Sequence, residues 1–382
     1  MDYLIPEEFS QFAELTRQFV RQELWPHEEE VERADCVAPS LAARLRAKAV
    51  ELGLFGFNMP EEAGGPGLPY LAQVLIREQL GQASVALADM VGRPPKALLV
   101  CQGEQRQRLL QPAVRGEKIW AFALTEPGAG SDAAAIRTRA TREQGGWRLN
   151  GTKHFISHGN HADYVIVIAK ASQADGDVPA AFVVERGAAG FSVGRIHRKM
   201  GWRGYPICEL VFDGVFVGDD NVLGAIGDGL RLGLANILES RIGVAAHCVG
   251  MAQRAYDYAV EHLRVRRQFG RQLGSFQGLQ WMVADMAVEI EQSRALLYAA
   301  AREMDRGGDA RAAVSMAKLS ATEMAGRVAD RALQLLGGAG YMAESPIEMI
   351  YRDARAFRIG EGTSEIQKNQ IARACLGREM FA

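Results

Sequence analysis

Residues 230–251 read LRLGLANILESRIGVAAHCVGM, and the apolar side chains in this stretch recur at helical intervals. An apolar stripe begins at Leu230 and Leu234 and continues to Met251 in steps of three or four residues, which predicts an amphipathic helix. The stretch lies within a proline-free segment, residues 207–345. Because proline breaks a helix interior at a cost of about 3 kcal/mol, its absence permits long helices.

Two further segments of the proline-free part have a helical pattern. They run from about residue 276 to 304 and from about residue 311 to 336. Helices of this length joined by short connections favour an antiparallel bundle. We expect the third of these helices to end at the glycines of residues 334–340, QLLGGAG.

The middle of the chain has the pattern of strands. Segments rich in β-branched or aromatic residues alternate with turn residues, which is typical of a small antiparallel sheet. These segments are residues 120–124, 164–169, 180–184 and 208–217. Within residues 146–157, Asn150-Gly151 is a hairpin signal.

The beginning of the chain returns to helical patterns. Residues 41–54 precede Gly56, and residues 71–80 precede Gly81; a glycine commonly follows the end of a helix. The fold class that we expect is α+β, mainly α. The expected domains are an N-terminal α-helical domain (1–118), a middle β-sheet domain (119–225) and a C-terminal helical bundle domain (226–382).

Composition and charge exclude several classes of protein. The 382 residues are 48% hydrophobic and 24% charged, as in soluble globular proteins. The net charge of −2 gives no electrostatic reason to expect nucleic acid or an anionic membrane as a partner. The five cysteines are scattered, which argues against a disulfide framework and a thiolate zinc site. With no signal pattern in MDYLIPEEFSQF and no apolar run long enough for a membrane, we expect a cytoplasmic protein.

The first candidate site is residues 123–132, ALTEPGAGSD. Its glycines expose backbone N–H groups, and Thr125 and Ser131 add hydroxyls, so that the loop could hold an anionic or carbonyl-rich ligand. It is neither a P-loop nor a G-x-G-x-x-G fingerprint. A plain turn explains these residues equally well.

The second candidate site is residues 359–367, IGEGTSEIQ. Ser364 and Gln367 have the spacing of a capping box, which predicts that a helix begins there. Glu361 then precedes a helix N-terminus and stands between two glycines, which let a partner approach its backbone. Such a carboxylate could be a general base, although a solvated loop glutamate is the commoner case.

The third candidate site is residues 264–270, RVRRQFG, with Gln277 shortly after. The arginine fork matches the oxygens of a diphosphate, and Phe269 could lie on a planar ring. A charged helix end before Gly270 explains the same residues without a ligand.

Three histidines, His154, His158 and His161, would share one face of a helix and could there bind zinc. Gly151, Gly159 and the β-forming residues around them argue against a helix. We therefore expect no metal site.

Taken together, these motifs closely resemble the acyl-CoA dehydrogenase family of flavoproteins, over essentially the whole chain. The first family signature is intact at residues 123–135. The second is present at residues 334–353, with Met349 where the pattern has Lys or Arg. The resemblance implies a helical N-terminal domain, a central β-domain and a C-terminal four-helix bundle.

The resemblance also implies FAD as the cofactor and a set of residues around it. Three of them would serve the FAD of a neighbouring subunit, namely Arg266, Phe269 and Gln277. The remaining FAD contacts would be Leu124, Thr125, Ser131, Phe155, Ser157, Gln334, Gly338, Thr363 and Glu365, the last in place of the Gln of some relatives. Substrate contacts would be Ser131, Arg241 and Gly362.

By the same resemblance, Glu361 is the catalytic base. It would take the α-proton of an acyl-CoA thioester while a hydride leaves the β-carbon for flavin N5. The Glu361 N–H and a flavin ribityl hydroxyl would stabilise the developing enolate. In some relatives the base lies on a bundle helix, where this chain has Ser240. Gly360 stands where relatives for straight chains often have tyrosine, so we expect a branched, cyclic or otherwise bulky acyl group.

The implied partners are an acyl-CoA thioester, an electron-transfer flavoprotein and further copies of the chain in a homotetramer. Three alternatives stay open. The chain could oxidise an acyl group on a carrier protein, or it could be an oxidase on the same fold, because fold alone does not decide function. A flavin-free binding protein is the more distant alternative.

Overall fold

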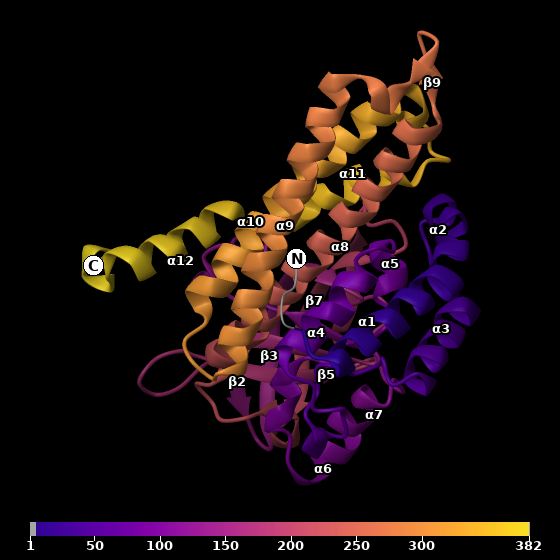
Figure 1. Cartoon of the computed structure of the whole chain (residues 1–382). Coiled ribbons are helices and arrows are strands. Elements are labelled where there is room, and N and C mark those ends of the chain that lie inside the picture. The colour runs from indigo at the N-terminus through magenta and orange to yellow at the C-terminus, as the bar shows by residue number, and fades with distance from the viewer. Residues whose placement is uncertain (1–4, 382) are drawn as a thin grey trace.

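Three blocks of secondary structure follow one another along the chain (Figure 1). The computed structural model describes residues 5–381. Within them, short helices come first, a sheet follows, and long helices end the chain. The predicted order of the blocks and the mainly α fold class are confirmed.

The helices of the N-terminal block pack around an apolar core of their own. They are α1 (Glu7–Phe19), α2 (Glu28–Ala34), α3 (Pro39–Glu51), α4 (Tyr70–Leu80), α5 (Val85–Ala88), α6 (Gly103–Gln105) and α7 (Gln111–Val114). Gly81 follows α4 directly, as predicted. The helix predicted at residues 41–54 ends earlier, at Glu51, because Gly53 turns the chain in the left-handed conformation (φ +68°).

The middle block is one sheet. Its strands are β1 (Trp120–Ala123), β2 (Arg139–Glu143), β3 (Gly146–Ser157), β4 (Tyr164–Ala171), β5 (Val178–Glu185), β6 (Phe191–Ile196), β7 (Ile207–Gly218) and β8 (Val222–Leu223). They lie in the order β6-β7-β3-β2-β4-β5-β8, with β1 beside β4. Most neighbours are antiparallel, as predicted, but β4 runs parallel to both β1 and β2.

The hairpin predicted at Asn150-Gly151 is wrong. β3 runs through these residues and pairs with β2 on one side and β7 on the other. The turn between β2 and β3 is at Gly145 (φ +77°). Gly151 lies at a register shift between β3 and β7, and a Cβ there would be 2.6 Å from Thr138 Oγ1. Glycine serves a close approach inside the sheet here, which local sequence does not distinguish from a turn.

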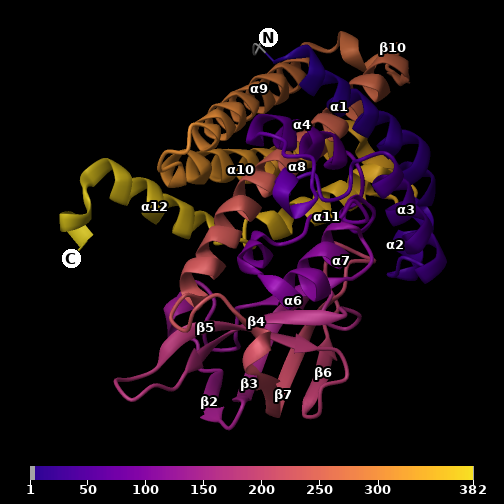
Figure 2. The ribbon, with the colours of Figure 1, turned by 90° about the horizontal axis from the view of Figure 1, so that it is seen from below.

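The C-terminal block contains three long helices at the predicted places. Its elements are α8 (Gly229–Val265), β9 (Arg267–Gln268), β10 (Arg271–Gln272), α9 (Gln277–Asp305), α10 (Arg311–Leu336), α11 (Pro346–Phe357) and α12 (Ser364–Leu376). α10 packs against α8, α9, α11 and α12, and it ends before Gly337 (φ +60°), as predicted. The far end of α12 projects from the body in both views (Figures 1 and 2).

The domain boundaries at 118/119 and 225/226 stay a prediction. Both fall in connections between elements, because α7 ends at Val114 and β1 begins at Trp120, while β8 ends at Leu223 and α8 begins at Gly229.

Helix α8 joins the sheet to the helical layer above it (Figure 2). Its first residue packs so closely on β5 that a Cβ at Gly229 would lie 2.5 Å from the Ala180 carbonyl carbon. One turn later, Leu232 belongs to the apolar cluster that includes Ile166 and Ile168 of β4. The same helix then continues into the core of the bundle.

Helix α8 also crosses α4 at very short range. A Cβ at Gly250 would lie 1.8 Å from the Glu78 carbonyl oxygen, and a Cβ at Gly81 would lie 2.2 Å from the His247 carbonyl oxygen. Both positions therefore require glycine, since any side chain would push the two helices apart. This crossing sets the distance between the N-terminal block and the bundle.

Buried ion pairs secure the two blocks around that crossing. The Glu78 carboxylate accepts hydrogen bonds from Arg294 Nε (2.9 Å) and from the Tyr298 hydroxyl (2.8 Å) of α9. On the other side, Arg254 of α8 forms two 2.6–2.7 Å hydrogen bonds with Glu28 of α2. Charges removed from water must be paired in this way, because an unpaired buried charge costs several kcal/mol.

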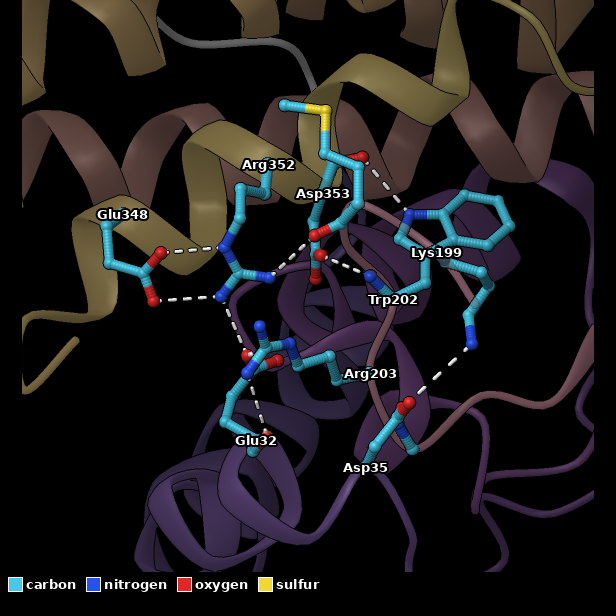
Figure 3. Close-up of polar contacts among 10 residues, drawn as sticks. Glu32, Asp35, Lys199, Trp202, Arg203, Glu348, Arg352 and Asp353 are labelled. Carbon is cyan, nitrogen blue, oxygen red and sulfur yellow. Dashed lines mark hydrogen bonds and ion pairs between the residues drawn. The ribbon is translucent and has the colours of Figure 1, made fainter. Parts of the chain in front are cut away.

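All three blocks meet at a cluster of charged side chains below α11 (Figure 3). Arg352 donates to Glu348 one turn earlier (2.6 Å) and to Glu32 of the N-terminal block (2.7 Å). Next to it, Asp353 Oδ1 accepts the backbone N–H of Trp202 at 2.5 Å, and its own carbonyl accepts the Trp202 indole N–H at 3.1 Å. The connection from β6 to β7 is thereby attached to the bundle.

Asp353 is the buried acid of this cluster. Burial raises the pKa of its carboxyl to about 7, the Trp202 N–H acts against this, and the nearby Glu32 adds to it. The folded protein therefore holds a proton on Asp353 up to about pH 7, whereas an unfolded Asp loses it near pH 4. Folding stability from this group is present below pH 4 and is lost as the pH rises through about 7.

We predict that Asp353→Asn makes the protein more stable relative to the wild type as the pH rises from 5 to 9. The amide keeps an oxygen that can accept the Trp202 N–H, but it cannot ionise. Thermal unfolding of both proteins, followed by circular dichroism at pH 5, 7 and 9, measures the difference in Tm. All other titrating groups are common to both proteins, so a difference in Tm that stays constant with pH would contradict the assignment.

Candidate active site

Glu361 occupies a turn between α11 and α12. The chain leaves α11 at Phe357, and Glu361 takes a left-handed backbone conformation (φ +56°) that is rare for a residue with a side chain. Such strain persists only where surrounding contacts impose it, and it is found most often at functional sites.

Three side chains impose this conformation by binding the carbonyls of the turn. Arg241 Nε of α8 donates to the Glu361 carbonyl at 2.8 Å. Lys318 Nζ of α10 donates to the Gly362 carbonyl at 2.8 Å, and Gln367 Nε2 of α12 donates to the same oxygen at 2.9 Å. A Cβ at Gly362 (φ +89°) would lie 2.9 Å from both the Arg241 guanidinium and the Gln367 amide. The structure thus brings Glu361, Arg241 and Gly362 together.

The Glu361 carboxyl has an unusual electrostatic environment. Burial raises its pKa, and the positive charges of Arg93, Arg241 and Lys318 act in the opposite direction. Lys318 is itself buried, which lowers the pKa of its ammonium to about 8. A carboxylate whose pKa is moved toward neutrality is suited to accept and release a proton.

Helix α12 begins at Ser364, as predicted, but its cap differs from the prediction. Thr363 is the N-cap residue, and its hydroxyl accepts the Ile366 N–H at 3.4 Å. The Ser364 hydroxyl instead donates to Glu323 of α10 at 2.6 Å. Gln367 faces back toward the turn of Glu361. Tertiary partners have therefore replaced the local capping box.

The loop after β1 depends on two residues that sequence reasoning missed. Glu126 accepts Lys153 Nζ at 2.7 Å and the Thr138 N–H at 3.0 Å, and Lys153 also donates to the Leu124 carbonyl at 2.8 Å. Burial lowers the pKa of Lys153 to about 8. The sequence signal for this pair is a lysine inside a predicted strand, because a buried lysine requires a charged or polar partner.

The three predicted site residues of this loop differ in their exposure to solvent. Leu124 is buried, Thr125 is half-buried, and Ser131 is exposed. The Thr125 carbonyl accepts the His154 N–H at 2.8 Å, which attaches the loop to β3.

The end of β3 carries Phe155 and Ser157. Phe155 is 60% exposed, has a left-handed backbone (φ +57°) and stacks on His154 with ring centroids 4.0 Å apart. It presents a bare aromatic face of the kind that binds a planar ring.

Tyr205 connects this strand to Glu361. Burial raises the pKa of the Tyr205 phenol, the charges of Asp89 and Glu361 raise it further, and the adjacent Ser157 hydroxyl lowers it. Ser157 and Glu361 therefore both act on the same phenol, which relates the end of β3 to the Glu361 turn.

The remaining predicted residues lie apart from Glu361. Arg266, Phe269 and Gln277 are exposed around the β9–β10 hairpin, at the tip of the bundle (Figure 1), and Phe269 is 92% exposed. Gln334 and Gly338 are exposed where α10 ends. Thr363 is half-buried beside the Glu361 turn, while Glu365, two residues further on in α12, is exposed. Within one chain, the tip residues do not reach Glu361.

The fit of the site to FAD can be judged from these side chains. An exposed aromatic face, a neighbouring serine hydroxyl and the anchored Thr125 loop suit a flavin ring, and exposed arginines suit a diphosphate. The residues present therefore fit the cofactor.

A metal site has no support in the described part of the chain. His154 lies in β3, whereas His158 has left the strand (φ +62°) and lies 2.9 Å from Asp89. Residues 5–381 contain no group of three or more His, Cys, Asp or Glu that could hold a metal ion. No helix in that range is both long enough and apolar enough to cross a membrane.

Met349 marks the departure from the second family signature. It is 4% exposed and belongs to the apolar core of the bundle. An apolar side chain fits this position of α11, where a cation would need a buried partner.

Comparison with known proteins covers the whole chain. The acyl-CoA dehydrogenase N-terminal, middle and C-terminal domains match residues 6–117, 121–215 and 227–376. A 3-(aryl)acrylate reductase of Clostridium sporogenes is 38% identical over 96% of this chain and 98% of its own length, and an acyl-CoA dehydrogenase of Bacillus subtilis is 37% identical over 98% and 99%. The structure of butyryl-CoA dehydrogenase from Megasphaera elsdenii matches with a TM-score of 0.91 and 34% identity, over 98% of this chain and 100% of that one. The chain belongs to the acyl-CoA dehydrogenase family.

Proposed function

We propose that this chain is an FAD-dependent acyl-CoA dehydrogenase in which Glu361 is the catalytic base. The observation that carries the proposal is the Glu361 carboxyl, which lies half-buried on a strained turn and has a pKa raised by desolvation. A desolvated carboxylate on a strained turn lowers the stability of the fold, and such groups are found most often at catalytic sites, where they transfer a proton.

The Glu361 turn also supplies a hydrogen-bond donor. Its carbonyl is bound by Arg241, but its backbone N–H has no acceptor among residues 5–381. Because the turn cannot rotate, this N–H keeps a fixed direction and can donate to the thioester carbonyl of a substrate. A donor placed in advance stabilises the enolate charge that develops when Glu361 removes the α-proton.

FAD, when bound, supplies the acceptor for the hydride that leaves the β-carbon. We propose that Phe155, Ser157 and Thr125, with Leu124 and Ser131 of the same loop, hold its ring. Thr363, Glu365, Gln334 and Gly338 would contact the rest of the cofactor. The exposure of Arg266, Phe269 and Gln277 supports a role for them toward the FAD of a neighbouring subunit in a homotetramer.

Two neighbouring positions on α8 bear on the choice of base. Ser240, where some relatives have the base, carries no carboxylate, and its hydroxyl lies 3.3 Å from Arg93 Nη2. Glu239 is a buried carboxylate, but it accepts a hydrogen bond from Asn58 and lies within 3.7 Å of Arg93 and 3.6 Å of Lys96. Because Arg93 and Lys96 stabilise the charged form of Glu239, its carboxylate is a poor proton acceptor. We therefore propose Glu361 as the base.

The physiological partners are part of the proposal. We infer that electrons pass to an electron-transfer flavoprotein and that the protein works in the cytoplasm, where its five free cysteines suit a reducing environment. The C. sporogenes relative is named as a reductase of 3-(aryl)acrylate. We therefore include the reverse reaction, the reduction of an enoyl group, in the proposal. The carrier-bound substrate and the oxidase remain the alternatives.

The space at Gly360 supports the proposal of a bulky acyl group. A Cβ at Gly360 would meet only the Ala356 carbonyl, at 3.7 Å. The chain therefore leaves room beside Glu361 that a tyrosine would fill.

We predict that Glu361→Gln binds FAD but loses at least about a thousandfold in the rate at which an acyl-CoA bleaches the flavin, because the amide cannot take the α-proton. Anaerobic stopped-flow absorbance measures this rate. Glu344→Gln, on an exposed residue outside the site, is the control. Near-normal bleaching in Glu361→Gln would refute the base, and loss of bleaching in Glu239→Gln would then move the role to α8.

We predict that kcat/KM falls as the pH is lowered through a pKa above the ordinary range of a glutamic acid, because only the carboxylate accepts the α-proton. Lys318→Met removes a charge that lowers the Glu361 pKa, so the acid limb of the profile moves to higher pH. Lys368→Met, with the same charge change on an exposed face of α12, leaves the profile in place. If the acid limb of the Lys318→Met profile lies at the same pH as in the wild type, Lys318 does not lower the pKa of Glu361.

A further inference from the structure

Tyr205 lies in the connection from β6 to β7 and has no role in the reaction proposed above. Two residues later the chain enters β7, where Ile207 pairs with Ser157 at the end of β3. The side chains of Tyr205 and Ser157 are hydrogen-bonded to each other. Since Ser157 is one of the residues that we assign to the flavin ring, Tyr205 is one contact away from the cofactor.

The turn that carries Tyr205 is attached to the rest of the protein on both sides. Trp202 has a left-handed backbone (φ +55°), and its backbone N–H and its indole N–H both donate to Asp353 of α11. The Gly204 N–H donates to Asp35, the residue after α2, at 2.8 Å, and a Cβ at Gly204 (φ +77°) would lie 2.5 Å from a side chain of α2. The Tyr205 N–H closes the turn on the Trp202 carbonyl at 3.1 Å. The backbone of Tyr205 is therefore fixed in place.

The ring of Tyr205 is held by aromatic neighbours. The His158 ring packs against it in a T-shaped arrangement with centroids 4.6 Å apart, and the Trp202 indole does so at 5.6 Å. His158 is itself anchored, because its Nε2 lies 2.9 Å from the Asp89 carboxylate and its N–H donates to the Pro206 carbonyl at 3.1 Å. A ring enclosed by packed neighbours has few rotamers open to it, so the phenol hydroxyl keeps one direction.

The phenol of Tyr205 stays protonated and is therefore a hydrogen-bond donor. Burial raises its pKa above the ordinary value, and the charges of Asp89 and Glu361 raise it further. Ser157 and Arg77 act in the opposite direction without cancelling the increase. A phenol is a stronger acid than a serine hydroxyl, so in a hydrogen bond between the two the phenol donates and the serine oxygen accepts. The hydrogen of the Ser157 hydroxyl then remains free for another acceptor.

We propose that Tyr205 is a positioning residue for the flavin, whose phenol donates to Ser157 and thereby orients the Ser157 hydroxyl toward the flavin ring. Tyr205 acts through Ser157 and touches neither the cofactor nor the substrate. A serine hydroxyl without such a partner rotates to suit any nearby acceptor, and fixing its direction in advance avoids that loss of order when the ring binds. The inference rests on the proposed function, because it requires a flavin ring beside Phe155 and Ser157.

The test combines two single variants with their double variant. Tyr205→Phe removes the phenol hydroxyl and keeps the ring, while Ser157→Ala removes the hydroxyl that the phenol orients. The readout is the visible absorbance and circular dichroism of the oxidised flavin in FAD-loaded protein without substrate, because both respond to hydrogen bonds at the ring. We expect Tyr205→Phe to change both spectra in the same direction as Ser157→Ala. The double variant should match Ser157→Ala alone, because residues that act as one unit are not additive.

The rate of flavin bleaching is a second readout, measured with whichever of butyryl-CoA, isovaleryl-CoA and 3-phenylpropionyl-CoA bleaches the wild type fastest. We expect each single variant to lose about tenfold, the effect of one neutral hydrogen bond, and the double variant to lose no more than Ser157→Ala. Tyr164→Phe is the matched control, because it also removes a phenol hydroxyl, one that donates to the Leu109 carbonyl at 3.2 Å. It should keep the wild-type spectra and rate. FAD content and Tm show that each variant is folded.

The outcomes separate this inference from the proposed function. If Tyr205→Phe or Ser157→Ala leaves the flavin spectra unchanged, or if their effects add fully in the double variant, Tyr205 does not act through Ser157. The inference is then overturned and the dehydrogenase stands. If none of the thioesters bleaches a bound flavin, the proposed function fails, while the spectra of the substrate-free protein still decide the role of Tyr205.

Discussion

The close crossing of α8 over α4 is the constraint on which the rest of the structure depends. The two helices touch backbone to backbone, since a Cβ at Gly250 would lie 1.8 Å from the Glu78 carbonyl oxygen. One end of α8 lies on the sheet and the other in the bundle. Its middle carries Arg241 to the Glu361 turn and Glu239 to Arg93. A small change in this crossing would therefore move Arg241 and, with it, the turn that carries Glu361.

Buried charged side chains are the second constraint on the structure. At the interfaces between blocks, buried charges meet opposite charges, as in Arg254 with Glu28, and they serve stability and register. At Glu361 the effects oppose one another, because desolvation raises the pKa of the carboxyl while Arg93, Arg241 and Lys318 lower it. Asp353 shows that a structural cluster can also retain a titrating acid.

Where the physics was local, sequence reasoning succeeded. The apolar stripes of α8, α9 and α10 and the glycine after α4 depend on residues a few positions apart, and the structure confirms them. Where a distant partner intervened, it failed. Asn150-Gly151 has the sequence pattern of a turn, but Thr138 packs against Gly151 inside the sheet. Ser364 has the spacing of a capping residue, but its hydroxyl donates to Glu323 of another helix.

The fold class, the order of the blocks and the place of Glu361 before a helix can be predicted from the amino-acid sequence. Periodicity, helix-terminating glycines and short motifs encode these features in neighbouring residues. The side chains that surround Glu361, and the contact by which Glu126 and Lys153 anchor the loop after β1, emerge only in the folded protein. The reason is physical: burial and charge pairing are properties of three-dimensional neighbours, and these residues become neighbours only when α4, α8 and the sheet pack together.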